Sequence, residues 1–182
     1  MTEIIEDLAR ASGNANGLHV TKKLMSLTLK PEYKKFQAEI VKQVIKNSIE
    51  MSQNPYGNYA VQIVLDNYSQ ESVIGIIEAL KEKAPQLSGA KYSSNVIEKC
   101  MEKAGDKLKD EIIYEIANAD SLIGLMKNKF GNFVIQKALS LGSPKMREEL
   151  VRRLQQNVPL LSSKKLKATW AKTLEDLKNG NI

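Results

Sequence analysis

A short sequence motif, here called the frame, occurs four times in this chain and constrains its fold more than any other feature. In its clearest copy, at residues 57–62, the frame reads GNYAVQ, and the other copies keep a small first residue and the helical pattern behind it. Aligned on that first residue, the copies begin 40, 36 and 38 residues apart, at Gly17, Gly57, Ser93 and Gly131. A period of this length is typical of a solenoid, in which each repeat is one supersecondary unit that buries its apolar face only against its neighbours.

Apolar residues recur at helical spacing between the copies of the frame, and no alternating strand pattern of comparable length competes with them. Pro31, Pro85 and Pro144 interrupt the pattern at positions where a helix ends or begins. We therefore predict an all-α chain with two or three helices per repeat. Its 182 residues are predicted to form a single domain, with repeats at about 2–38, 39–75, 76–112 and 113–154 and a C-terminal cap at 155–182.

The two ends of the chain are expected to differ from its middle. At the start, Thr2 is predicted to cap one short helix through residues 4–9, and Val20 and Leu24 are predicted to lie on the apolar face of the next helix. At the end, residues 162–178 keep helical spacing but lack the frame and are rich in lysine. These are the properties of a terminal capping helix, and Trp170 is predicted to lie in its core.

Composition limits the partners and the compartment. The chain carries a formal charge of +6, of which +5 lies between residues 141 and 182, and this is compatible with a polyanionic partner. No apolar run approaches the roughly 18 residues that a membrane-spanning helix needs, so we expect no membrane association. Cys100 is the only cysteine, which rules out an internal disulfide and favours a reducing compartment.

Catalysis finds little support in the sequence. His19 is the only histidine and Cys100 the only cysteine, so neither a Cys/His zinc cluster nor a nucleophile–base dyad can be assembled with confidence. The sequence also lacks a Gly-rich phosphate loop of the GxxxxGKS type. We expect no catalytic residues, no metal and no cofactor, and a protein that is not an enzyme.

Ligand-binding chemistry is expected at the variable positions of the frame. The residue after the first Gly or Ser and the residue four positions later lie one helical turn apart on the same face, as Asn58 and Gln62 do. Both can contact one ligand group. The residue between them in register, Tyr59 in this copy, is rotated towards the neighbouring repeat, where a planar side chain can stack between successive flat ligands.

The copies resemble the RNA-facing helices of Pumilio-family (PUF) repeat proteins, whose repeats each recognise one base with two or three side chains. The resemblance covers nearly the whole chain, from about residue 2 to 178. It rests on three triplets at one register: Asn58-Tyr59-x-x-Gln62, Ser94-Asn95-x-x-Glu98 and Asn132-Phe133-x-x-Gln136. It implies a right-handed α-solenoid, similar to the C-terminal repeats of the family's domain, that binds single-stranded RNA along its concave surface with the two chains antiparallel.

The resemblance assigns one base to each triplet, and side-chain chemistry agrees with the assignment. An Asn and a Gln one turn apart offer both donors and acceptors, which suits the mixed edge of uracil. An ionised Glu only accepts, and guanine presents two adjacent donors at N1 and N2. The predicted base-edge contacts are therefore Asn132 and Gln136 on the first U, Ser94 and Glu98 on G, and Asn58 and Gln62 on the second U of 5′-UGU-3′. The predicted stacking residues are Tyr59, Asn95 and Phe133, together with His19 of the first copy.

The first copy departs from the pattern at Leu18, His19 and Lys22. Leu18 cannot hydrogen-bond through its side chain and Lys22 can only donate, so this repeat either holds a base or phosphate loosely or binds nothing. Lys22 is therefore a candidate for a weak contact with RNA. Lys99 and Lys137 follow the base-selecting positions and are candidates for phosphate contact, with an ordinary surface charge as an equal alternative.

The resemblance also implies a biological role. The protein is expected in the cytoplasm, on the 3′ untranslated regions of UGU-containing messenger RNAs, where its outer face recruits repressor or deadenylase proteins. Family domains usually contain about eight repeats, so a chain with four is expected either to form a homodimer or to follow further N-terminal repeats. Two alternatives stay open: a helical scaffold that binds proteins, and a PUF-like protein that binds RNA without sequence selectivity in ribosome assembly. The alternating amides, carboxylate and aromatic rings at the frame positions favour selective RNA binding.

Overall fold

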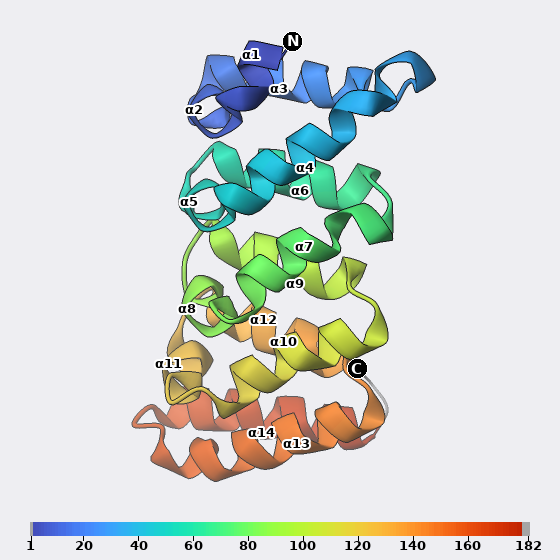
Figure 1. The fold of residues 1–182 in the computed structure, drawn as a ribbon. Helices are drawn as coiled ribbons and strands as arrows, with labels where there is room; N and C mark the ends of the chain where they lie inside the picture. The colour runs from blue at the N-terminus through green and yellow to red at the C-terminus, as the bar shows by residue number, and fades with distance from the viewer. Residues whose placement is uncertain (1, 180–182) are drawn as a thin grey trace.

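The computed structural model describes residues 2–179, and within that range the chain forms fourteen α-helices and two short 3-10 helices with no β-strand. Figure 1 shows these helices stacked in successive tiers from the N-terminal end to the C-terminal end. The predicted all-α stack is therefore confirmed. None of the described helices is both long and apolar enough to span a membrane. The parts of the predicted domain and cap that fall on residues 1 and 180–182 lie outside the described residues.

Each of the four tiers contains a short helix, a helix that carries the frame and a third helix. The short helices are α2 (Leu8–Ser12), α5 (Ser48–Gln53), α8 (Ala84–Ser88) and α11 (Leu122–Lys127). The frame helices are α3 (Ala15–Leu27), α6 (Gly57–Asn67), α9 (Ser93–Lys103) and α12 (Gly131–Leu141). The third helices are α4 (Gln37–Lys46), α7 (Gln70–Lys81), α10 (Asp106–Asn118) and α13 (Pro144–Asn157). In addition, α1 (Thr2–Glu6) and η1 (Pro31–Phe36) belong to the first tier, and η2 (Val158–Leu160) and α14 (Lys164–Lys178) follow the last.

The helices form two continuous layers, because each helix packs on its counterpart in the next tier. In the frame layer α3 contacts α6, α6 contacts α9 and α9 contacts α12, and in the second layer α4, α7, α10 and α13 follow one another in the same way. The apolar core is a line between the layers. Ala60, Val96 and Val134, which share one position of the frame, are fully buried.

An asparagine sets the start of the frame helix in the second and fourth tiers. The Oδ1 atom of Asn54 accepts from the backbone N–H groups of Tyr56 at 2.8 Å and Gly57 at 2.9 Å. Its Nδ2 group donates to the carbonyl of Gly13 in the preceding tier at 3.4 Å. Asn128 makes the equivalent bonds in the fourth tier, including one to the carbonyl of Gly89 at 2.9 Å. One side chain thus satisfies free donors of a helix end and joins two tiers.

The small first residue of the frame is required by a close approach of the short helix. A Cβ atom on Gly57 would lie 2.9 Å from the carbonyl oxygen of Met51, and a Cβ on Gly17 would lie 1.7 Å from the carbonyl oxygen of Ala11. In the third tier the residue is Ser93, whose Oγ donates to the carbonyl of Leu87 at 2.7 Å. The frame therefore permits only a residue that is very small or that bonds the facing carbonyl.

The first tier corrects two predictions. The single helix predicted from Thr2 is two helices that meet at Asp7, and Thr2 is a residue of α1 rather than its cap. The bend lets both Ile5 and Leu8 become fully buried, in α1 and α2, which each contact α4. Val20 was predicted to lie on the apolar face of its helix, but it is 51% exposed, since among residues 2–179 no helix packs before α3 in the frame layer.

The C-terminal cap follows the prediction in its described part. Helix α14 covers the end of the stack, and Trp170 is buried, with its Nε1–H donating to the carbonyl of Met126 in α11 at 3.0 Å. The predicted core position of Trp170 is confirmed.

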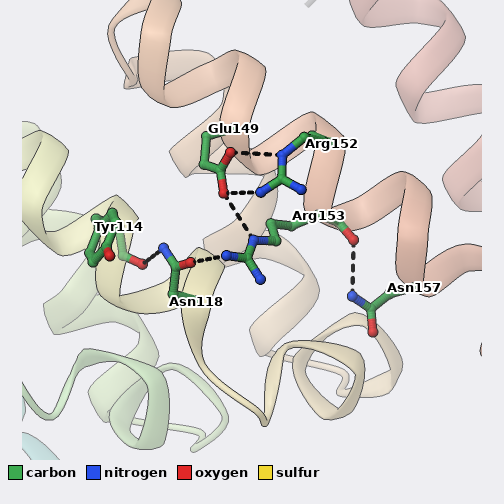
Figure 2. Close-up of polar contacts among 6 residues, drawn as sticks. All are labelled: Tyr114, Asn118, Glu149, Arg152, Arg153 and Asn157. Atoms are coloured by element: carbon green, nitrogen blue, oxygen red, sulfur yellow. Dashed lines mark hydrogen bonds and ion pairs between the residues drawn. The ribbon is translucent and has the colours of Figure 1, made fainter.

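A polar cluster joins the third and fourth tiers at the surface of the second layer (Figure 2). Glu149 of α13 accepts from Arg152 at 2.6 and 2.9 Å and from Arg153 at 2.9 Å, and these two guanidinium groups lower the pKa of Glu149 to about 2. Arg153 also donates to Asn118 of α10, whose Nδ2 group donates to the carbonyl of Tyr114 at 2.9 Å. Exposed ion pairs stabilise a fold only slightly, so the main effect of this cluster is to align α13 with α10.

Candidate nucleic-acid interface

The frame helices bring the predicted amide pairs into direct contact. In α6 the Nε2 group of Gln62 donates to Oδ1 of Asn58 at 3.0 Å. In α12 the Nε2 group of Gln136 donates to Oδ1 of Asn132 at 3.3 Å. Both pairs lie one turn apart on the same side of their helices, as the spacing predicts.

Each asparagine of these pairs is also bonded to its own helix start. The Nδ2 group of Asn58 donates to the carbonyls of Asn54 at 2.8 Å and Pro55 at 3.0 Å, and the side chain is only 1% exposed. The Nδ2 group of Asn132 donates to the carbonyl of Asn128 at 2.8 Å, and this side chain is partly buried. The glutamines are the outer members of the pairs.

Planar side chains stand in a row beside the pairs. Tyr59 is 50% exposed and Phe133 is 58% exposed, which is unusual for large aromatic rings. Asn95 occupies the same position in α9 and is also exposed. The row runs through three adjacent helices of the frame layer, so flat ligands could insert between its members.

The third tier places a carboxylate where the other two place a glutamine. Glu98 is partly buried, and this burial raises its pKa above the usual value for a glutamic acid. The nearby charge of Lys137 opposes the rise and that of Glu102 adds to it. Ser94, the residue one turn before, is buried. A partly desolvated carboxylate lowers its free energy by accepting hydrogen bonds from a ligand.

A ladder of ion pairs runs along the edge of this face across three tiers. Lys99 lies 3.2 Å from Asp66 of α6 and 2.9 Å from Glu102, and Lys137 of α12 lies 2.7 Å from Glu102. Lys103 adds a second contact to Asp66 at 3.3 Å. The hydrogen bonds from Lys137 and Lys99 lower the pKa of Glu102, and the bond to Glu102 raises the pKa of Lys99. The two lysines predicted to contact phosphate are thus paired with acids in the free protein.

The first tier does not form a pair of this kind. Leu18 is buried, and Lys22 is exposed with its ammonium group 5.3 Å from the centre of the Tyr59 ring. His19 is exposed and lines a groove of about 540 Å³ at the N-terminal end of the stack, together with Ile4 and Val20. Lys22 therefore contacts the stacking row of the next tier rather than a partner on its own helix.

The asparagines that begin the frames were missed as functional residues in the sequence. Asn54 and Asn128 supply the carbonyls that hold the amide groups of Asn58 and Asn132. The available signal was an asparagine three residues before each frame glycine, at positions 14, 54 and 128. Asp66 and Glu102 of the ladder were also missed, because the contacts from Asp66 to Lys99 and from Glu102 to Lys137 join neighbouring helices.

Among residues 2–179, no group of three or more His, Cys, Asp and Glu side chains is placed to hold a metal ion. Cys100 is buried, and burial raises the pKa of its thiol to about 12. A thiol in this state is a poor nucleophile.

The chain matches a protein-family model. The model of the Pumilio-family RNA binding repeat (PUF) matches residues 47–80, 83–117 and 121–154, which together make up more than half of the chain. The matched repeats begin several residues later than the repeats predicted above. The predicted boundaries stay predictions, because a continuous stack of helices does not mark where one repeat ends and the next begins.

Curated relatives carry the same name. Pumilio homolog 12 of Arabidopsis thaliana is 36% identical over 122 residues, which cover 67% of this chain and 20% of that protein. A Pumilio domain-containing protein of Schizosaccharomyces pombe is 34% identical over 125 residues, covering 69% of this chain and 18% of that protein. The chain thus spans about a fifth of the length of these relatives.

Solved structures confirm the architecture. The Puf4 RNA binding domain bound to the HO endonuclease RNA 3′ UTR recognition sequence superposes with a TM-score of 0.81 at 19% identity, covering 98% of this chain and 54% of that chain. PUF-8 in complex with PBE-RNA gives a TM-score of 0.69 at 22% identity, covering 97% and 63%. These likenesses, together with the four tiers and the cap, confirm the predicted right-handed α-solenoid of Pumilio-type repeats.

Proposed function

Because the chain belongs to the Pumilio family of RNA-binding repeat proteins, we propose that it binds single-stranded RNA in a sequence-selective way along the exposed side of its frame helices. One observation carries the proposal. Three adjacent tiers present, at the same register, two polar side chains one turn apart beside an exposed planar residue, and in the second and fourth tiers the two polar side chains are hydrogen-bonded to each other. Repeated spacing of this kind suits a polymer whose flat units also repeat.

The proposed sequence is 5′-UGU-3′. Glutamine offers an acceptor and a donor, which match the N3–H group of uracil and one of the carbonyl oxygens that flank it. The carboxylate of Glu98 accepts from both N1–H and N2–H of guanine, and such charge-assisted bonds are the strong ones. With the chains antiparallel, the fourth tier takes the first U, the third tier takes G and the second tier takes the second U.

Stacking supplies much of the proposed affinity. Base stacking on an aromatic ring contributes about 1 to 3 kcal/mol per base. The rings of Tyr59 and Phe133 are half exposed or more, so their faces are available, whereas the amide of Asn95 offers a smaller plane. Three bases then give a modest affinity for RNA.

Phosphate attraction is proposed to be a minor contribution. Lys99 and Lys137 are paired with Asp66 and Glu102, so a phosphate would have to compete with these carboxylates. Binding that depends on few phosphate contacts weakens only slightly as salt rises. We therefore expect a shallow salt dependence for UGU-containing RNA.

The wider role is proposed on the family alone. Solved relatives include Puf3 and Puf4 RNA binding domains bound to 3′ UTR recognition sequences. We propose that this chain likewise acts on messenger RNA 3′ untranslated regions in the cytoplasm, as a non-catalytic binder that recruits repressor or deadenylase proteins. Reporter messages with and without UGU sites, together with the location of a tagged chain in cells, test this part.

Binding of labelled single-stranded RNAs tests the selectivity. Fluorescence anisotropy would compare RNAs of equal length that contain UGU, UUU or ACA. The wild type is expected to prefer UGU, and Glu98→Gln is expected to lose this preference, because glutamine replaces an acceptor-only group with a mixed one.

Glu102→Gln is the matched control. Glu102 lies one turn further along α9, in the ladder, so this change removes the same charge but should leave the preference for UGU intact. Equal binding of all three RNAs with a steep salt dependence would mean phosphate attraction only. If no RNA binds, the protein-binding scaffold becomes the better proposal.

A further inference from the structure

The N-terminal end of the stack carries an apolar groove that no other helix among residues 2–179 covers. Val20, Leu24 and Leu27 of α3 line it together with Ile4 of α1, and its volume is about 540 Å³. Val20 is 51% exposed, whereas the residues at its position in the later tiers are fully buried. Apolar surface that gathers in one place and is open to water is typical of an interaction site.

Charges of opposite sign flank the apolar residues at this end. Lys23 of α3 lines the groove and is exposed. A second hollow, which shares Ile4 with the groove, is lined by Glu3 and by Asp7. Asp7 pairs with Arg10, whereas within residues 2–179 neither Glu3 nor Lys23 has an ion-pair partner. The surface therefore offers one free base on one side of Ile4 and one free acid on the other.

The opposite end of the stack is a poor partner for this surface. Helix α14 exposes Lys164, Lys165 and Lys172, so a head-to-tail contact between two copies would place these lysines beside Lys23. A head-to-tail contact also repeats from copy to copy, and it gives a ring or a filament rather than a dimer.

A second copy of the same surface fits better. With a two-fold axis near Ile4, α1 of each copy would lie over the groove of the other, and each Glu3 would face a Lys23. The same copies turned the other way would set Glu3 against Glu3 and Lys23 against Lys23, which is repulsive. The charges thus favour one orientation, and in that orientation the apolar residues of the groove are removed from water.

We propose that this N-terminal surface binds a second copy of the chain and forms a two-fold symmetric dimer. Burial of Val20 and Ile4 supplies the affinity, and the contact between Glu3 and Lys23, which the symmetry generates twice, sets the orientation. Of the two expectations drawn from the sequence, a homodimer or further N-terminal repeats, the proposal commits to the homodimer. It does not rest on the proposed function, because the interface needs no RNA.

Sedimentation equilibrium of the chain without RNA, over a range of micromolar concentrations, tests the dimer. The wild type is expected to pass from monomer to dimer as its concentration rises. Val20→Asp should raise the dissociation constant roughly 30-fold or more, because a two-fold interface buries the new charge twice. Ile74→Asp is the matched control: Ile74 of α7 is 40% exposed in the second layer, so this variant should dimerise like the wild type. Circular dichroism verifies that both variants are folded.

Exchange of the two charges tests the orientation. Glu3→Lys alone and Lys23→Glu alone should each raise the dissociation constant roughly five- to thirtyfold, because symmetry converts two attractions into two repulsions. An equimolar mixture of these two variants should dimerise again. In the mixed dimer one contact is the native pair, and the other is the same pair with its charges exchanged.

The possible results separate this proposal from RNA binding. A chain that stays monomeric at high concentration would overturn the dimer and leave the surface to a different protein. A dimer that withstands Val20→Asp, or charge variants that do not associate when mixed, would also overturn it. Each of these results would leave the UGU proposal unchanged, and a chain that dimerises but binds no RNA would contradict only the proposed function.

Discussion

Acidification should weaken the recognition of guanine in a way that isolates Glu98. In the proposed complex the ionised carboxylate would accept from two N–H groups of guanine, whereas protonation would turn one of its oxygens into a donor that faces another donor. Bonds to charged groups contribute about 1.5 to 3 kcal/mol, so we expect a loss of about 2 to 3 kcal/mol, or roughly 30- to 150-fold in affinity.

The pH window follows from the surroundings of Glu98. Burial raises its pKa in the free protein, with Glu102 adding to the rise and Lys137 opposing it. Affinity for UGU should therefore be highest where Glu98 is ionised and should fall as the pH decreases through this raised pKa. The fall should begin at a higher pH than it would if the base were bound by a fully exposed glutamate. Lys137→Met removes the opposing charge, so the fall should move to still higher pH.

The assay is fluorescence anisotropy at constant ionic strength, with UGU and UUU RNAs, from neutral to acidic pH. The ratio of the two affinities should fall on acidification for the wild type and stay flat for Glu98→Gln. Circular dichroism at each pH verifies that the chain is folded. A wild-type ratio that does not change with pH, or a decline of equal size in Glu98→Gln, would refute the assignment of Glu98 to guanine.

Three further predictions concern the fold. Gly17→Ala should destabilise the first tier by at least about 3 kcal/mol, because the new Cβ would lie 1.7 Å from the Ala11 carbonyl oxygen. On heating, part of the helical circular dichroism signal should then be lost before the Trp170 fluorescence changes, and a single joint transition would contradict this prediction. Trp170→Phe should cost about 1 to 3 kcal/mol in urea denaturation, because the Met126 carbonyl loses its 3.0 Å donor, and an unchanged midpoint would count against that bond. Cys100, whose thiol pKa burial raises to about 12, should resist an aromatic disulfide reagent at pH 8 until urea is added, so rapid reaction of the native chain would be the opposing result.

The sequence predicted the stack because a solenoid depends on local patterns. The frame spacing, the helical apolar pattern and the prolines each act within one tier, and every tier repeats them. The core position of Trp170 followed from the same helical spacing at the cap.

Two features that the sequence did not predict depend on contacts between tiers. Val20 is exposed because, in the described part of the chain, no helix packs before α3 in the frame layer, although the residue itself matches the buried Ala60 and Val96. The ladder from Asp66 to Lys137 requires the relative heights of three helices. Neither the exposure of Val20 nor the relative height of three helices can be predicted from the apolar pattern of a single helix.

In the candidate site, too, the sequence predicted some features and not others. Spacing alone placed Asn58 and Gln62 on one face, but it did not show that the amide of Asn58 turns inwards to the backbone of its own helix start. Hydrogen-bond direction depends on which carbonyls are free at the helix start, and that is set by the turn at Asn54.

The two ends of the stack differ in the surface that they offer to an additional repeat. At one end Val20 is half exposed, at a position where Ala60, Val96 and Val134 are fully buried by the tier before them. At the other end α14 turns Lys164, Lys165 and Lys172 to the solvent. An engineered repeat packed against the N-terminal side of α3 would bury the exposed Val20, whereas one joined after α14 would have to bury lysines. We therefore expect a lengthened stack to be more stable when the repeat is added at the N-terminal side, and under the proposed antiparallel binding the added repeat would extend the RNA site in the 3′ direction.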